Sequence, residues 1–163
     1  MAYTFNLDEI FAMAEEIERN GARFYRRAAE VTTVPRAKDL FQELAQWEDG
    51  HERLFQRLRD KLVDAGAAEP TVYDPSGDAE LYLQAMAEQH VFRRDLDVED
   101  MVDATDGPRG VLELALQFER DSIMFFLGMK AVVPAHMAPE KVDRLISEEM
   151  GHIVYLTKQL ALL

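Results

Sequence analysis

One spacing of acidic residues and histidines occurs twice in this chain of 163 residues. Each copy consists of a glutamate, a second glutamate 30 residues later and a histidine three residues after that. The two copies, offset by 101 residues, are Glu18, Glu48 and His51, and Glu119, Glu149 and His152. Two Glu-x-x-His helices and one glutamate from each of two further helices form the set with which a four-helix bundle holds two metal ions in its core. The pattern therefore predicts an all-α bundle with a two-metal site.

Apolar residues recur with helical spacing along four long segments, which predicts two helix pairs. We place the first pair at about 6–65, a crossover at about 66–106 that contains a short helical stretch, and the second pair at about 107–162. Short turns make each pair an antiparallel hairpin, and the long connection can run from one end of the bundle to the other. The chain, 1–163, is expected to form a single domain, and no segment shows strand-like alternation.

Composition excludes several classes of function. The chain has 31 acidic and 18 basic residues, and a net charge of −13 argues against nucleic acid binding. It has no cysteine, which excludes disulfides, thiolate zinc sites and iron–sulfur clusters. Neither a secretory signal nor an apolar run of about 20 residues is visible, so we expect a cytoplasmic protein without a membrane span.

The candidate ligands differ from the many other acidic residues because they lie inside apolar stripes. Glu48 and His51, for example, are bracketed by Leu44 and Phe55. An unpaired carboxylate in such surroundings costs several kcal/mol, and four that face one another repel strongly. Two divalent cations balance four negative charges, and the three-residue spacing aims each Glu-x-x-His pair at the same metal.

Residues near the candidate ligands have more than one reading. Rotation by about 100° or more around the helix assigns a set of neighbouring glutamates to the solvated face. This set is Glu15, Glu16, Glu52 and Glu148. Tyr25 and Tyr155 lie on ligand-bearing faces, where their hydroxyls either contact ligand carboxylates or accompany ordinary core packing. Trp47 is predicted to point away from the site, and His90 and His136 match no ligand spacing.

Glycines inside the predicted helices also have two explanations. Gly50 and Gly151 immediately precede the two histidines, and Gly21 lies near the first glutamate. Glycine inside a helix costs about 1 kcal/mol relative to alanine, so its presence calls for a reason. Close helix packing and open space around the metals both provide one.

Two segments carry a resemblance to a known family. Residues 18–25 (ERNGARFY) and 119–126 (ERDSIMFF) are similar to the first- and third-helix motifs of the ferritin-like di-iron carboxylate proteins, in their rubrerythrin-like branch. The two Glu-x-x-His segments resemble that branch's second and fourth helices. The resemblance implies that Glu18 and Glu119 are terminal ligands and that Glu48 and Glu149 are bridging ligands. It also implies that each histidine binds one iron.

The same resemblance implies a function. It indicates a site of two iron ions in which the six ligands are the catalytic residues of an oxidoreductase acting on hydrogen peroxide or dioxygen. The family's additional glutamate is replaced here by Ser122, and its cysteine-rich rubredoxin module has no counterpart, so an electron donor would be a separate protein. Symmetry statistics favour a homodimer.

Three matters stay open at this point. Oxygen and nitrogen ligands also suit manganese, zinc or cobalt. The chain could store or buffer iron with little turnover. It could also be an interaction bundle whose site is vestigial or filled with zinc.

Overall fold

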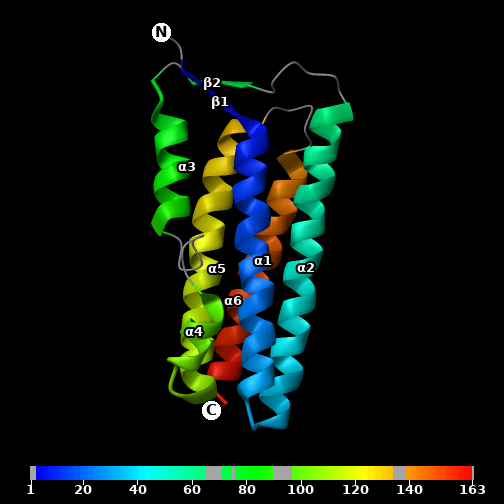
Figure 1. Ribbon diagram of the computed structural model, residues 1–163, viewed down its shortest axis with the longest axis vertical. Coiled ribbons are helices and arrows are strands. Elements are labelled where there is room, and N and C mark those ends of the chain that lie inside the picture. The colour runs from blue at the N-terminus through cyan, green and yellow to red at the C-terminus, as the bar shows by residue number, and fades with distance from the viewer. Residues whose placement is uncertain (1–2, 65–70, 75, 90–96, 134–138, 163) are drawn as a thin grey trace.

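Four long helices form the body of the molecule in a computed structural model that describes residues 3–64, 71–74, 76–89, 97–133 and 139–162. They are α1 (Leu7–Val31), α2 (Pro35–Asp64), α5 (Gly107–Val132) and α6 (Pro139–Leu160). Within each pair, α1 with α2 and α5 with α6, the helices run in opposite directions (Figure 1). The predicted all-α bundle of two antiparallel pairs is confirmed.

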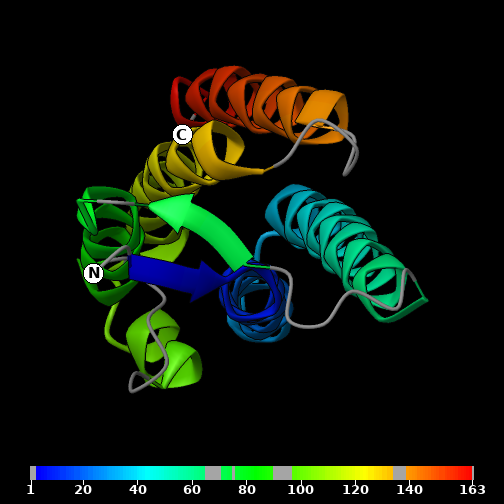
Figure 2. The same ribbon diagram turned by 90° about the horizontal axis from the view of Figure 1, so that it is seen from above.

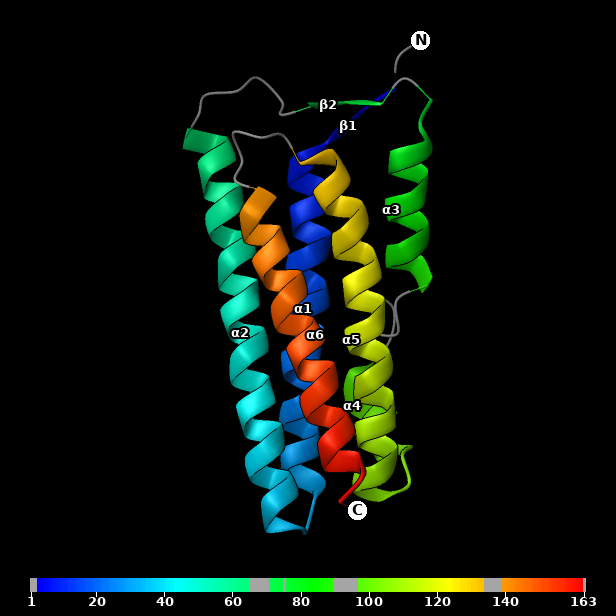
Figure 3. The ribbon, with the colours of Figure 1, turned by 180° about the vertical axis from the view of Figure 1, so that it is seen from behind.

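The crossover runs along the bundle and contains two helices. α3 (Asp78–Gln89) packs beside α5, and the short α4 (Val98–Asp103) packs beside α1 (Figure 2). Two ion pairs join α1 and α4, with Arg23 2.7 Å from Glu99 and Arg27 2.8 Å from Asp103. The crossover starts at one end of the bundle and finishes at the other, so α2 and α5 run in the same direction (Figure 3). This is the predicted one-crossover topology.

A two-stranded sheet at one end of the bundle was not predicted. β1 (Tyr3–Asn6) pairs antiparallel with β2 (Thr71–Asp74), with Tyr3 opposite Asp74 and Asn6 opposite Thr71. Each strand has only four residues, too few for alternation to be recognised. The expectation of no strand was therefore wrong at this point. The sheet joins the segment before α1 to the segment after α2.

The side chain of Asp74 links this sheet to the crossover. Its Oδ2 atom accepts hydrogen bonds from the backbone N–H groups of Ala79 and Glu80, at 3.0 and 3.1 Å. These are orphan donors in the first turn of α3, so Asp74 caps that helix although it lies outside it.

The apolar stripes of the four long helices meet in an aromatic-rich core. Fully buried rings fill it, namely Phe11, Phe24, Tyr25, Phe41, Phe55, Phe118, Phe125 and Phe126. None of the described helices is both long enough and apolar enough to cross a membrane. The core is interrupted halfway along by a cluster of polar side chains.

Candidate metal centre

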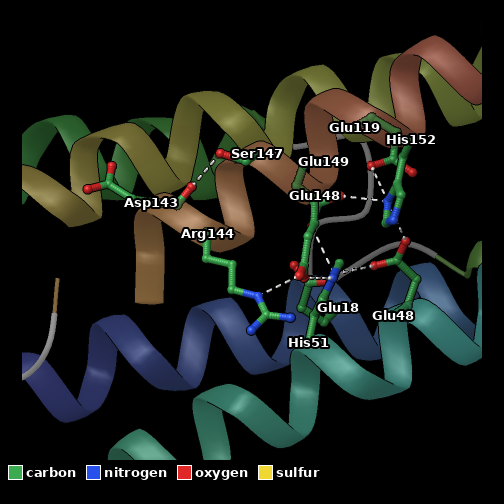
Figure 4. Close-up of polar contacts among 10 residues, drawn as sticks. All are labelled: Glu18, Glu48, His51, Glu119, Asp143, Arg144, Ser147, Glu148, Glu149 and His152. Atoms are coloured by element: carbon green, nitrogen blue, oxygen red, sulfur yellow. Dashed lines mark hydrogen bonds and ion pairs between the residues drawn. The ribbon is translucent and has the colours of Figure 1, made fainter. Parts of the chain in front are cut away.

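All four long helices contribute to this polar cluster. Its members are Glu18 of α1, Glu48 and His51 of α2, Glu119 of α5, and Glu149 and His152 of α6. The structure thus brings together all six residues that the repeated spacing selected (Figure 4). The four glutamates are 0% exposed, whereas His51 and His152 retain 6% and 7% of their surface. The histidines therefore form the outer edge of the cluster.

Glu149 is shared between the two histidines. Its Oε1 atom lies 2.9 Å from Nδ1 of His51, and its Oε2 atom lies 2.9 Å from Nδ1 of His152. Glu48 is placed in the same way at longer range, with one oxygen 3.5 Å from His51 and the other 3.9 Å from His152. Each of these carboxylates faces both halves of the cluster.

Glu18 and Glu119 each face one half. Glu18 approaches Nδ1 of His51 at 3.3 Å, and Glu119 approaches Nδ1 of His152 at 3.4 Å. Two overlapping groups result, in which one ligand atom per residue lies within 4.8 Å of the others. They are Glu18, Glu48, His51 and Glu149, and Glu48, Glu119, Glu149 and His152. This arrangement is the one expected for two terminal and two bridging carboxylates, whose role as metal ligands stays a prediction.

Several oxygens in the cluster lack hydrogen-bond partners among the described residues. These are Oε1 of Glu18 and both oxygens of Glu48 and Glu149. The close approaches of Glu149 to the imidazoles bring nitrogen and oxygen together without hydrogen-bond geometry. Buried polar atoms left in this state cost about 1–3 kcal/mol each, and more when charged. Carboxylate oxygens and imidazole Nδ1 atoms that converge in this way fit a pair of cations.

Electrostatics in the metal-free cluster also indicate an excess of negative charge. Burial, followed by repulsion from other carboxylates, raises the pKa of Glu18 and of Glu119 well above the usual 4.5. Burial alone would lower the pKa of His51 and His152, but the facing carboxylates, Glu149 above all, raise both pKa values. For the carboxyl group of Glu149, burial would raise the pKa. The two neighbouring histidines outweigh this effect and hold its pKa below the usual value. Without metal, the cluster therefore retains protons.

Glu148 contacts the cluster from outside, although its rotation around the helix predicts a solvated position. Its Oε2 atom lies 3.3 Å from Nε2 of His51, the ring nitrogen that points away from the carboxylates. Arg144 donates a hydrogen bond to its other oxygen at 2.8 Å (Figure 4). Rotation around α6 alone could not predict this contact, because its partner belongs to α2.

Trp47, which the sequence predicts to point away from the site, lies against it. Its ring stacks on His152 at a centroid distance of 4.7 Å and an interplanar angle of 10°. Trp47 belongs to α2 and His152 to α6, so this contact too crosses between helices. The two histidines thus differ in their outer contacts, a carboxylate for His51 and an indole ring for His152.

Glu15, which the sequence predicts to be solvated, is buried. Arg59 of α2 donates to it at 3.2 Å and Arg19 lies 3.7 Å away, so its charge is compensated inside the α1–α2 contact. Its burial therefore depends on a neighbouring helix. It is not among the residues that converge on the two histidines.

The two tyrosines have different roles. The fully buried hydroxyl of Tyr25 donates a hydrogen bond to Oε1 of Glu119 at 2.9 Å. Of the two explanations offered for Tyr25, the contact with a candidate ligand carboxylate is therefore the correct one. The hydroxyl of Tyr155 instead donates to Glu43 at 3.1 Å, on the outside of the α2–α6 contact. Ser122 is fully buried on α5, one turn beyond Glu119. His90 and His136 lie outside the described residues.

Comparisons with known proteins agree with this architecture. Residues 1–59 match the rubrerythrin family. A crystal structure from Thermotoga maritima, described as a candidate ferritin-like diiron-carboxylate protein, superposes with a TM-score of 0.71 and 21% sequence identity. The match covers 98% of this chain and 97% of the other. A comparison with curated proteins finds no match. The family match thus covers β1, α1 and most of α2, and the fold match covers nearly the whole chain.

Proposed function

We propose that this ferritin-like protein, whose first helix pair matches the rubrerythrin family, binds two iron ions and uses their electrons to reduce hydrogen peroxide or dioxygen. The placement of Glu149 is the observation that supports this most directly. Its two oxygens lie at equal distance from His51 and His152, so this carboxylate would be able to serve both ions. Four carboxylates neutralise two divalent ions, which removes the repulsion within the cluster.

Two ferrous ions held by the six ligands would supply the two electrons with which one hydrogen peroxide molecule and two protons give two water molecules. The chain's own residues hold the site in shape. The Tyr25 hydroxyl fixes the orientation of Glu119, and Glu148 fixes the ring of His51 so that Nδ1 faces inward. The four glutamates are fully buried whereas the two histidines keep part of their surface, so a small oxidant would reach the cluster past the histidines.

Anaerobic loading followed by oxidation tests this proposal. The chain is titrated with ferrous iron, the excess is removed, and hydrogen peroxide or dioxygen is added while near-ultraviolet absorption is followed. We expect about two ferrous ions per chain and rapid appearance of protein-bound ferric absorption. The isosteric variant Glu149→Gln serves as the control and should show neither. Tight binding of two ferrous ions that neither oxidant oxidises would contradict the redox part of the proposal.

Iron stoichiometry and solution mass separate turnover from storage. The two overlapping ligand groups support two ions per chain, whereas storage requires many. The expected homodimer would have twice the chain mass of 18.7 kDa. Metal analysis of protein purified without added metal distinguishes iron from manganese, zinc or cobalt, which the same ligands accept. A zinc-filled chain without iron would favour an interaction bundle instead.

A further inference from the structure

A groove of about 760 Å³ lies between α2 and α6 and leads to the candidate metal centre. Figure 3 shows these two helices side by side. Its inner wall includes His51 and His152, and Trp47, Leu54 and Leu145 give it an apolar lining. This volume is within the range of small-molecule sites and far exceeds the needs of hydrogen peroxide.

Two glycines keep the groove open beside the histidines. A Cβ atom on Gly151 would meet nothing within 4 Å, and one on Gly50 would meet only the end of Arg53 at 4.0 Å. Gly21 differs, because a Cβ atom there would lie 2.5 Å from the ring of Phe118. Close helix packing therefore explains Gly21. Open space explains the two glycines that precede the histidines.

The outer part of the groove is cationic, although the chain as a whole has a net charge of −13. Arg57 and Lys141 line it, and Lys61 faces Lys141 closely enough that its charge, followed by burial, lowers the pKa of Lys141. None of the ion pairs described for the chain joins a carboxylate to these three, although the charge of Glu140 acts on the pKa of Lys141 in the opposite direction to that of Lys61. Glu148, which also lines the groove, is already paired with Arg144 at 2.8 Å.

We propose that this groove binds an organic anion with an apolar body, such as a medium-chain carboxylate. The carboxylate lies between Arg57, Lys61 and Lys141, and the hydrocarbon lies along the apolar lining toward the histidines. Arg57 follows His51 by six residues, which is about 9 Å along the helix, so a short chain spans this distance. The inference rests on the proposed function only where it places the hydrocarbon beside a pair of iron ions.

Binding of octanoate to the full chain tests the inference. Trp47 is the chain's single tryptophan and lies in the groove wall, so its fluorescence reports occupancy independently of iron chemistry. Calorimetry and fluorescence are recorded on the protein as purified and after anaerobic ferrous loading. We expect saturable binding of one octanoate per chain in both, weakened by salt. Absence of binding up to millimolar octanoate, or equal binding of octylammonium, overturns the inference.

A matched pair of double variants isolates the charge. Lys61→Gln with Lys141→Gln removes one lysine from each helix at the groove, and relief of their repulsion leaves the fold intact. Lys38→Gln with Lys158→Gln removes one lysine from each of the same helices at the other end of the bundle. We expect the first pair to weaken octanoate binding about tenfold and the second to leave it unchanged. Equal effects of the two pairs overturn the inference.

A third variant tests the place of the hydrocarbon. Gly151→Met fills the groove without a backbone clash, so it should abolish the fluorescence response to octanoate while retaining the helical circular dichroism. An unchanged octanoate affinity in this variant overturns the placement. Iron oxidation without octanoate binding would refute this inference alone, and octanoate binding without iron oxidation would refute the proposed function alone.

Discussion

Nε2 of His51 lies 3.3 Å from a carboxylate oxygen of Glu148, whose other oxygen accepts a hydrogen bond from Arg144 at 2.8 Å. A carboxylate on the outer nitrogen fixes the ring orientation of a metal-binding histidine and increases its basicity. We therefore expect Glu148→Gln to weaken the ion on the His51 side about 10- to 100-fold and to spare the other.

A two-step metal titration by calorimetry measures this difference. Glu52→Gln is the control, because Glu52 follows His51 directly in sequence but pairs with Arg19 at 2.8 Å. Equal weakening of both binding steps by Glu148→Gln would contradict the assigned role.

Removing a carboxylate that faces both histidines should release more metal than removing one that faces a single histidine. Glu149 faces both histidines, whereas Glu18 faces only His51. We expect Glu149→Gln to lose both ions and Glu18→Gln to lose chiefly the one beside His51. Elemental analysis after dialysis, with circular dichroism to verify folding, measures the remaining metal. Loss of one ion in both variants would show that Glu149 does not bridge.

The stability of the metal-free chain should fall as pH rises. The pKa values of Glu18 and Glu119 lie above 4.5 in the folded chain, and those of His51 and His152 lie above 6.5, so folding takes up protons at these groups. These four groups contribute their full stabilisation when the pH is below their usual, unfolded-state pKa values. The contribution is lost as the pH rises through their raised, folded-state pKa values. Glu149, with its lowered pKa, contributes in the opposite direction only as pH falls below 4.5.

Thermal denaturation from about pH 6 to about pH 9, with and without metal, measures this effect. In chelator, Tm should decrease steadily over this range. With metal bound the ligands are already deprotonated, so the decrease should be smaller, and metal uptake should release protons to the buffer. Identical pH profiles with and without metal would count against the cluster as the binding site.

Two glycine-to-alanine variants should change stability in opposite directions. At Gly21 a methyl group would meet the buried ring of Phe118 at 2.5 Å, and overpacking of this kind costs about 1–3 kcal/mol. At Gly151 the methyl group meets nothing within 4 Å, so helix propensity should stabilise the fold by up to about 1 kcal/mol. Denaturant unfolding measures both variants. A destabilised Gly151→Ala would mean that the groove is not open at that point.

Periodicity within single helices was enough to predict the bundle and the meeting of the six polar residues. Apolar stripes placed the helix pairs within a few residues of their observed ends, since the first pair, predicted at about 6–65, begins at Leu7 and ends at Asp64. The repeated 30-residue spacing selected the glutamates whose burial requires compensation. Both signals depend on local sequence, because the geometry of a helix determines which residues lie on the same face.

Contacts between helices could not be predicted in this way. Glu148 and Trp47 were assigned outward on their own helices, yet each contacts a histidine of the facing helix. Glu15 is buried because Arg59 on α2 compensates its charge. The short β1–β2 sheet depends on two segments far apart in the sequence. In each case the missing information was the partner across the interface.

The unlike surroundings of the two histidines break the internal repeat of the chain. Each half of the sequence contributes the same three residue types, but His51 carries a carboxylate on its outer nitrogen and His152 lies under an indole ring. A negatively charged neighbour makes an imidazole the better electron donor to a cation. Protein given a single equivalent of metal should therefore hold it at the His51 half, as one defined species rather than an equal mixture of two.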